Sequence, residues 1–204
     1  MKIFFVIMGM FLLLFAAANG ANATSFTDSY NGRDYLLVLN PGISWDDASK
    51  ELRTNYGSNW HLATISSAEE QVFIENLIKI RTTVSDRDEY WLGGYQAPSA
   101  TDEEIWNWVN DEGTFWNDGL ISGVYSDFWG TGPNDSGPNS EDWLALDYRN
   151  SLSPGFGFND EGDLEYILGY VAESTPVPEP ATVLILGTGL VVFAVFRGKK
   201  FRKK

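Results

Sequence analysis

The sequence predicts an α+β domain in which two helices pack against short antiparallel sheets, with one long loop and no disulfide bonds. Three observations support this fold class. Apolar residues recur at helical spacing in two segments, and several other segments have the short apolar or alternating pattern of strands. Residues 117–142 are rich in Gly, Pro, Asn, Asp and Ser, the composition of a loop. A loop this long in a compact domain is usually functional or disordered.

The first elements are strands, a turn and a helix. Residues 26–38 carry closely spaced aromatic and aliphatic side chains and are predicted to form the opening strands, followed by the turn Asn40-Pro41-Gly42. Ser44 is the expected N-cap of the first helix, because two aspartates follow it in the first turn, where negative charge is favoured. Gly57 is expected to end this helix. Its apolar residues at helical spacing are Trp45, Ala48, Leu52 and Tyr56.

The second helix follows a short apolar strand at residues 61–65. The sequence Ser66-Ser67-Ala68-Glu69 fits a capping box, which marks the start of a helix. One apolar face is predicted for this helix, formed by Ala68, Val72, Leu77 and Ile80.

The remaining elements are strands. Residues 89–95 form a predicted strand, and residues 105–109 alternate as Ile-Trp-Asn-Trp-Val, which suits a strand with one buried face. Residues 110–113 have the composition of a hairpin turn. Beyond the long loop, 143–146 is a strand of buried type and 165–173 is the last strand.

Both ends of the chain have the composition of targeting segments. Residues 1–23 fit a signal peptide, with a basic start, an apolar run and the small residues Ala21-Asn22-Ala23 for signal peptidase; the alternative is an uncleaved anchor. Residues 176–204 combine Pro178-Glu179-Pro180, an uncharged apolar stretch at 181–196 and a basic end. That stretch is expected to enter the inner membrane with the basic residues on the cytoplasmic side. Residues 24–175 remain as one domain.

The charge of this domain limits its partners. The whole chain has 14 basic and 28 acidic residues, and the two ends contain seven basic residues and one acidic residue. The domain therefore holds 7 basic and 27 acidic residues, a net charge of −20. Such a domain repels nucleic acid and anionic lipid and attracts cations. It contains no cysteine, so its stability depends on its core, which is rich in aromatic residues, or on bound metal.

The order of these segments resembles the C-type lectin-like domain over residues 28–173. The motifs that carry the resemblance are Trp45-x-x-Ala48, His61-Leu62-Ala63-Thr64-Ile65-Ser66-Ser67, Trp91-Leu92-Gly93-Gly94, Trp106-x-Trp108, Phe128-Trp129-Gly130-Thr131-Gly132-Pro133-Asn134 and Tyr170-Val171-Ala172-Glu173. Each motif alone is weak, but together they occur in the order of that family. The resemblance implies the family's fold and its long loop.

This chain departs from the family at the cysteine positions. By the resemblance, Leu52 and Ala172 stand in place of one disulfide, and Trp143 and Leu164 stand in place of the other. All four residues are apolar. We therefore expect packing at these positions to replace the covalent bonds and to recover part of the roughly 2–5 kcal/mol that a lost disulfide costs.

The tail resembles a PEP-CTERM sorting signal because the Pro178-Glu179-Pro180 motif, the apolar span and the basic end occur in that order. The resemblance implies recognition and cleavage by an exosortase. It also implies a transient inner-membrane anchor, and then a place at the cell surface or in the extracellular matrix of a Gram-negative bacterium that produces exopolysaccharide. The alternative is an ordinary single-span anchor.

The lectin-like resemblance also implies a calcium site in the long loop. Calcium takes about 6–8 oxygen ligands, and the expected ligands for one ion are Asn134, Glu141, Asn159 and Asp160, which would also hydrogen-bond two adjacent sugar hydroxyls. Asp135 and Asp142 could serve a second ion. One position departs from the family pattern: Gly132 stands where sugar-binding members have Glu or Gln. The alternative is that these residues are solvated loop carboxylates and amides, which any turn-rich segment uses.

The sequence offers no catalytic constellation. There is no cysteine nucleophile, and the single histidine, His61, is expected to be a packed core residue rather than a general base. A glycosidase can work with two carboxylates alone, but no pair is distinguished by its spacing. The chain is therefore expected not to be an enzyme.

Together these features predict an exported binding protein of the cell surface or matrix that recognises carbohydrate, namely exopolysaccharide, with calcium ordering the loop. The main alternative is a structural or adhesion module that binds a protein partner without calcium or sugar. No nucleic acid partner is expected. One of the aromatic residues Trp116, Tyr125 or Trp129 could stack on a sugar ring, although such rings are more often part of the core.

Overall fold

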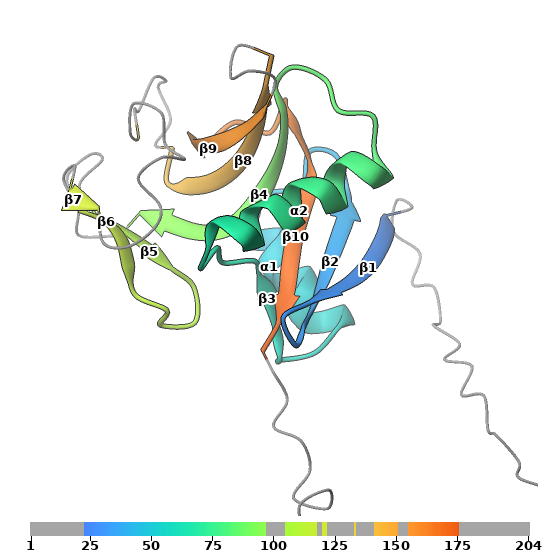
Figure 1. Ribbon diagram of the computed structural model, residues 1–204, viewed down its shortest axis with the longest axis horizontal. Coiled ribbons are helices and arrows are strands. Elements are labelled where there is room, and N and C mark those ends of the chain that lie inside the picture. Colours follow the sequence, from blue (N-terminus) through green and yellow to red (C-terminus); the bar gives the residue numbers. More distant parts are fainter. Residues whose placement is uncertain are drawn as a thin grey trace, which may run out of the picture.

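The computed structural model describes residues 23–96, 105–117, 120–121, 133, 141–150 and 155–175. The predicted signal peptide, the sorting tail and most of the long loop lie outside these residues. The described part is an α+β domain with two helices and ten strands in one connected sheet (Figure 1). Its elements are β1 (Thr24–Tyr30), β2 (Arg33–Leu39), α1 (Trp45–Asn55), β3 (Trp60–Leu62), α2 (Ala68–Arg81), β4 (Asp88–Gln96), β5 (Ile105–Trp108), β6 (Thr114–Asn117), β7 (Leu120–Ile121), β8 (Trp143–Arg149), β9 (Gly155–Glu161) and β10 (Ile167–Ser174).

The predicted start and end of α1 are confirmed. The Ser44 hydroxyl accepts a hydrogen bond from the Asp47 backbone N–H at 3.1 Å, so it satisfies one of the donors that the first turn leaves unpaired. Gly57 follows the C-cap residue with a φ of +99°, a conformation that favours glycine. The indole N–H of Trp45 donates to the Leu92 carbonyl at 2.7 Å and fixes the helix against β4.

α2 is confirmed as a helix with Leu77 buried, but the predicted capping box and the rest of the predicted apolar face are wrong. The N-cap is Ser67, whose hydroxyl accepts from the Glu70 N–H, so the capping box starts one residue later than expected. Val72 and Ile80, predicted to be core, are 56% and 66% exposed. The helix instead places the polar residues of its first turn toward the sheet, because Glu70 is hydrogen-bonded there. Its buried residues are Glu70, Gln71, Ile74, Leu77 and Ile78.

The strands form one mixed sheet rather than the separate antiparallel sheets expected from sequence. The main path runs β1-β2-β10-β4-β5-β6-β7, with β3 paired to β10, and β8 lying between β4 and β9. The pair β10–β4 is parallel and the others are antiparallel. β9 was not predicted as a strand. The strand predicted at 61–65 is shorter, since β3 ends at Leu62.

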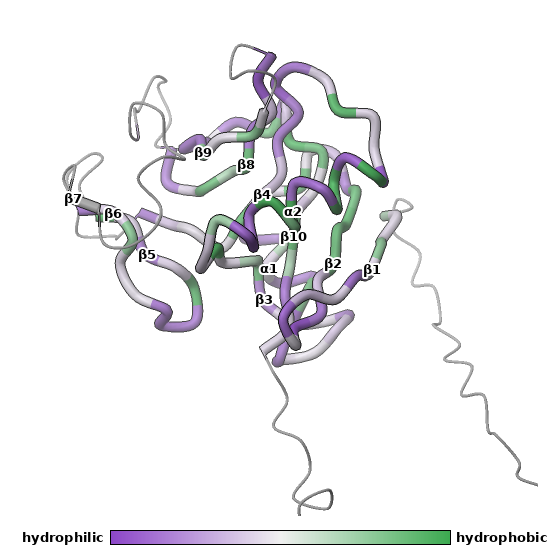
Figure 2. Tube along the Cα trace, viewed as in Figure 1, coloured by the Kyte–Doolittle hydropathy of each residue, from purple (hydrophilic) through white to green (hydrophobic). Residues whose placement is uncertain are grey.

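The two helices cover opposite faces of the sheet. Alternate residues of β2 point to the two sides, so that Tyr35 and Leu37 join a cluster with α2 while Leu36 and Val38 join a cluster with α1. Figure 2 shows hydrophobic residues along β2 and β8, which lie in the interior. The predicted buried face of β5 is confirmed, because Trp106 and Trp108 are both buried. The turn predicted at 110–113 joins β5 to β6.

The expected replacement of disulfides by packing holds at one of the two pairs of positions. Leu52 and Ala172 are fully buried and lie in the same cluster of core residues. Trp143 stacks on Trp45, with ring centroids 4.3 Å apart. Leu164, however, is 41% exposed and is not a packing partner, so that expectation is wrong. In the β8–β9 pair the residue opposite Trp143 is Glu161.

Candidate functional site

The β8–β9 pair brings two of the predicted ligand segments to neighbouring strands. Glu141 and Asp142 directly precede β8, and Asn159 and Asp160 lie near the end of β9. The register places Asp160 opposite Leu144, which follows Asp142 by two residues. Diagonal neighbours of this kind, here Asp160 and Asp142, lie about 7–8 Å apart in an antiparallel pair.

Burial differs among these four residues. Asp160 is 3% exposed, whereas Asn159, Glu141 and Asp142 are half-buried. Neighbouring residues of a strand point to opposite faces, so Asn159 shares a face with Glu161, to which its side-chain amide donates at 3.4 Å. Asp160 therefore lies on the other face of the β8–β9 pair.

The other two predicted ligands, Asn134 and Asp135, lie outside the described residues, as do Gly132 and the aromatic residues Tyr125 and Trp129. Within the described part of the chain, no group of three or more histidine and acidic side chains is arranged to hold a metal ion. A calcium site at this end of β8 and β9 would therefore have to combine its carboxylates with amide or backbone oxygens, or with residues of the loop.

A second set of polar residues, which sequence reasoning missed, lies on β4, β8 and β9, and its three acidic members are buried. We call Glu89, Asp147, Arg149 and Glu161 the acidic cluster. Glu89 is fully buried and lies opposite Asp147 in the β4–β8 pair. Burial, together with the negative charges of Glu161 and Asp147, raises the pKa of Glu89 to about 9, so this carboxyl group is protonated at neutral pH.

Arg149 is the positive member of the acidic cluster. Its guanidinium pairs with the Asp147 carboxylate and lies 3.9 Å from an oxygen of Glu89. Burial raises the pKa of Asp147, and Arg149 opposes this effect. Glu161 is held by its own turn, since its carboxylate accepts from the backbone N–H groups of residues 162 and 163 at 2.9 and 2.7 Å. The negative charge of the cluster is thus largely compensated by its own members, through the proton on Glu89 and the pairing of Asp147 with Arg149.

A third polar network, at the opposite end of the domain, connects β2 and β10 with Thr64, which lies two residues after the end of β3. The fully buried Glu173 carboxylate pairs with Arg33 at 2.5 Å and accepts from the N–H and hydroxyl of Thr64 at 2.8 and 2.6 Å. Glu112 accepts from the same hydroxyl at 2.6 Å. Burial lowers the pKa of Arg33, but its hydrogen bond and charge interaction with Glu173 outweigh burial and raise it.

A neighbouring network anchors the start of α2. The Glu70 carboxylate accepts from the backbone N–H and hydroxyl of Ser66, both at 2.6 Å, and from the Tyr35 hydroxyl on β2. Burial and this bond to Glu70 raise the pKa of Tyr35 well above its ordinary value. The contacts made by Glu70 explain why α2 turns a polar residue toward the sheet. Patterns of apolar residues carry no signal for such a contact.

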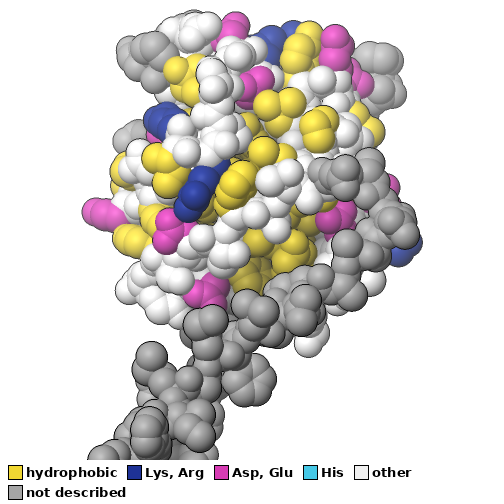
Figure 3. All heavy atoms as spheres, turned by 90° about the vertical axis from the view of Figure 1, so that its right-hand side faces the viewer, with side chains coloured by type: hydrophobic (Ala, Val, Ile, Leu, Met, Phe, Trp, Pro, Cys, Tyr) yellow, Lys and Arg dark blue, Asp and Glu magenta, His cyan; other side chains and the backbone are white. Residues whose placement is uncertain are grey.

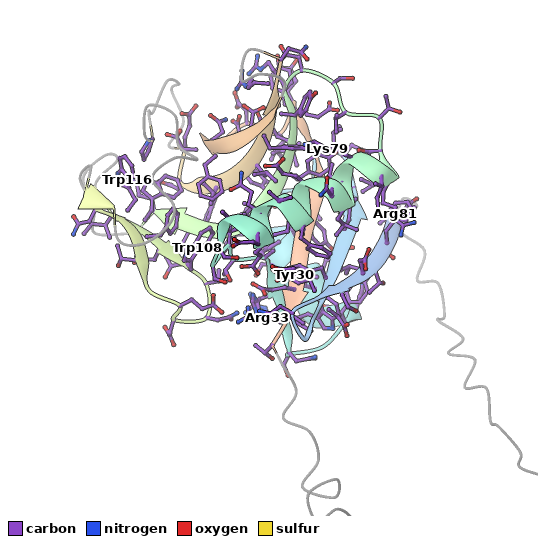
Figure 4. All side chains as sticks on the ribbon, viewed as in Figure 1. Tyr30, Arg33, Lys79, Arg81, Trp108 and Trp116 are labelled. Carbon is purple, nitrogen blue, oxygen red and sulfur yellow. The ribbon has the colours of Figure 1, made fainter. Side chains whose placement is uncertain are left out.

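The remaining site expectations concern the aromatic residues and the histidine. Trp116 on β6 is half-buried, while Trp108 on β5 is buried and stacks on Phe115 with ring centroids 4.2 Å apart (Figure 4). His61 on β3 is half-buried, with its Nδ1 2.9 Å from the Leu62 carbonyl. It lies beside Glu173 in the strand register rather than near β8 and β9.

Comparison with known proteins identifies the tail. Residues 176–200 match the PEP-CTERM protein-sorting motif. This match implies that the chain is exported, anchored transiently in the membrane, processed by an exosortase and sorted to the cell surface. Within the described residues, no helix is both long and apolar enough to cross a membrane. The sequence matches no curated protein.

Two solved structures resemble the domain. One is ovocleidin-17, a major protein of the eggshell calcified layer of Gallus gallus; the identity is 16%, the TM-score is 0.46, and the match covers 73% of this chain and 96% of that one. The other is EMS16, an antagonist of the collagen receptor integrin α2β1; the identity is 12%, the TM-score is 0.41, and the match covers 72% of this chain and 95% of that one. At such identities and TM-scores, the assignment to the C-type lectin-like fold depends on the sequence motifs.

Proposed function

We propose that this exported, surface-sorted chain is a binding module that recognises carbohydrate with the help of calcium, at the end of β8 and β9. The observation that carries the proposal is the β8–β9 register, which brings Asp160 close to the segment that holds Glu141 and Asp142. These residues are far apart in sequence. Their predicted partner Asn134 is the amide ligand of the family motif.

The chemistry of the proposed site follows from its oxygen donors. Carboxylate and amide oxygens are the ligands that calcium prefers, and the net charge of −20 over residues 24–175 attracts cations. The same groups could also hydrogen-bond two vicinal hydroxyls of a sugar, and a calcium ion held by them would polarise those hydroxyls. An exopolysaccharide of the producing cell is the proposed ligand because the sorting tail delivers the domain to that surface.

The rival function is adhesion to a protein partner without calcium or sugar. Two observations favour it: Gly132 supplies no side-chain oxygen, and the described residues contain no group of three acidic side chains arranged for a metal. Both proposals concern binding rather than catalysis. Turnover of a polysaccharide that is abolished by changing one carboxylate would contradict both of them.

Thermal unfolding of the full chain in detergent, with calcium and with chelator, tests the metal step. A ligand that binds only the folded state stabilises it by about 2.7 kcal/mol at a hundredfold excess over its Kd. We expect calcium to raise Tm in the wild type but not in Asn159→Ala/Asp160→Ala. A matched control, Asp46→Ala/Asn76→Ala, changes an exposed carboxylate and an exposed amide on the helices and is expected to retain the calcium effect.

The carbohydrate step is tested separately, by binding of the purified exopolysaccharide to the same three proteins. Calcium-dependent binding that is lost in Asn159→Ala/Asp160→Ala supports the proposal. If millimolar calcium shifts no Tm and the polysaccharide does not bind, the proposed function is wrong and the protein-binding rival is favoured. A calcium shift without polysaccharide binding rejects only the sugar step.

A further inference from the structure

β1 is the outer edge of the described sheet. It pairs with β2 along all seven of its residues, and no described strand pairs with its other side (Figure 1). An exposed edge presents unpaired N–H and C=O groups that can pair with another strand. Within β1 the single charged residue is Asp28 and there is no proline, so little prevents such pairing.

The hairpin geometry shows which backbone groups face the open edge. Asn31 and Gly32, with φ of 49° and 80°, form the two-residue turn between Tyr30 and its partner Arg33. The pair that closes such a turn is hydrogen-bonded, and the direction of the bonds alternates along each strand. The residues whose backbone groups point outward are therefore Ser25, Thr27 and Ser29.

We propose that β1 binds β1 of a second copy of this chain, antiparallel, about a two-fold axis at Thr27. In this register Thr27 faces the partner's Thr27, and Ser25 faces the partner's Ser29. All three outward-facing residues then exchange backbone hydrogen bonds with the other copy. Their small hydroxyl side chains form a continuous polar strip on one face of the extended sheet.

Charge complementarity selects this register. Phe26 faces the partner's Asp28, and the Arg81 guanidinium of the same chain lies 5.4 Å from the centroid of the Phe26 ring. Arg81 therefore meets the partner's Asp28, and the two-fold axis repeats this ion pair. In the single chain, Asp28 accepts from the Ser29 N–H at 2.8 Å. When the Asp28 carboxylate pairs instead with Arg81 of the other copy, the Ser29 N–H can donate to the partner's Ser25 carbonyl.

The neighbouring face of α2 supports a partner on this side. Tyr30 stacks on Phe73 with ring centroids 5.0 Å apart, and Arg81 covers Phe26, so α2 lies along β1 (Figure 4). Next to these two helix residues are Val72 and Ile80, the most exposed large hydrophobic residues described. The face that includes β1 shows hydrophobic side chains between charged ones (Figure 3). A two-fold axis normal to the sheet places both α2 helices on the same side, where this exposed apolar surface can be covered.

Disulfide cross-linking tests the register directly, because the natural chain contains no cysteine. In the full chain in detergent, Thr27→Cys places two thiols opposite each other at a Cα separation of about 5.5 Å, which a disulfide can span. Ser25→Cys is the matched control: the two copies of residue 25 are offset by about 13 Å along the strands. We expect a covalent dimer with Thr27→Cys, little or none with Ser25→Cys, and a mixed dimer when Ser25→Cys and Ser29→Cys chains are combined.

Charge exchange provides a second readout that does not depend on thiol chemistry. Arg81→Glu and Asp28→Arg are each expected to raise the dimer Kd about tenfold, since each variant opposes like charges twice per dimer. The double variant is expected to return to within about threefold of the wild type. Arg53→Glu, on the distant exposed part of α1, is the control. Equal cross-linking at 25 and 27, or none at 27 in a chain with unchanged circular dichroism, overturns the proposal; in the second case another segment or a different partner covers the edge.

Discussion

Among single residues, Glu89 has a folded-state pKa that makes the free energy of unfolding depend on pH. Its pKa of about 9 in the folded domain lies far above the ordinary value of 4.5. Between these values the unfolded chain releases a proton that the folded chain keeps. The stability contributed by Glu89 is therefore fully present below about pH 4.5 and is lost as pH rises toward 9.

Glu89→Gln is expected to remove this pH dependence, because the amide is neutral in both states and has nearly the same shape. One proton of difference corresponds to a slope of about 1.4 kcal/mol per pH unit. Urea unfolding at several pH values between 5 and 9 should give a wild-type curve that falls more steeply than that of the variant. Glu75→Gln, which changes a carboxylate paired with Lys79 on α2, should leave the slope unchanged. Parallel curves for wild type and Glu89→Gln would show that Glu89 is ionised in the folded domain.

Glu173 illustrates a different consequence of burial. Its carboxylate is fully buried and accepts from one charged donor, the Arg33 guanidinium, and from two neutral donors, the N–H and hydroxyl of Thr64. Removing the Glu173 side chain leaves the two donors of the buried Thr64 without this acceptor, while the half-buried Arg33 keeps Glu112 at 3.7 Å. Glu173→Ala is expected to destabilise the domain by about 1–3 kcal/mol, the cost of leaving buried donors unpaired, measured as a lower urea midpoint. The control Glu69→Ala removes an exposed carboxylate and should change stability by less than about 0.5 kcal/mol.

At the scale of elements, α2 shows where apolar periodicity was misleading. The predicted face included Val72 and Ile80, but the contacts of Glu70 with Tyr35 and Ser66 rotate the helix so that both are exposed. Ile74 and Ile78 are fully buried instead. For α1, by contrast, the cap, the buried residues and the end were all predicted, because its polar and apolar residues lie on separate faces.

The orientation of α2 can be tested by truncating one residue from each face. Ile74→Ala should cost about 2–5 kcal/mol because it creates a cavity in a close-packed core. Val72→Ala should lie within about 0.5 kcal/mol of the wild type, since an exposed side chain leaves no cavity. Chemical denaturation of both variants gives the comparison. If the Val72 variant were the less stable of the two, the observed register of α2 would be wrong.

The strands show the same division between local and distant causes. β5 was predicted with its buried face because Trp106 and Trp108 stand on either side of the polar Asn107. β9 was not predicted, since Gly155, Gly157, Asn159 and the acidic residues that follow are poor strand formers. Pairing with β8 along seven residues overrides that preference. The same pairing brings Asn159 and Asp160 next to β8, so the missed strand is the one that carries two of the predicted ligands.

At the scale of the whole molecule, the tail decides where the domain works. Residues 176–200 match the PEP-CTERM motif, which implies processing by an exosortase. Changing Pro178, Glu179 and Pro180 to alanine is expected to block this processing and to leave the chain in the membrane fraction at its unprocessed mass. Fractionation and mass spectrometry of cells that contain the exosortase measure both quantities. Cells without the exosortase are the control, and there the triple change should alter neither the membrane fraction nor the mass of the chain. Surface release of the altered chain would show that sorting does not need this motif.

The α+β class, both helices, most strands, the sorting tail, the acidic charge and the motifs that resemble a C-type lectin-like domain could all be derived from the amino-acid sequence. These features depend on short-range patterns: caps, the spacing of apolar residues, turn residues and composition. Only the tertiary structure decided that the strands join into one mixed sheet, that β9 pairs with β8, and that Leu164 is exposed while Trp143 packs on Trp45. It also placed Glu89, Asp147 and Glu161 in one buried cluster and left β1 at an open edge. Each of these depends on which distant segments become neighbours, and a carboxylate in a strand has the same local pattern whether it faces water or another carboxylate.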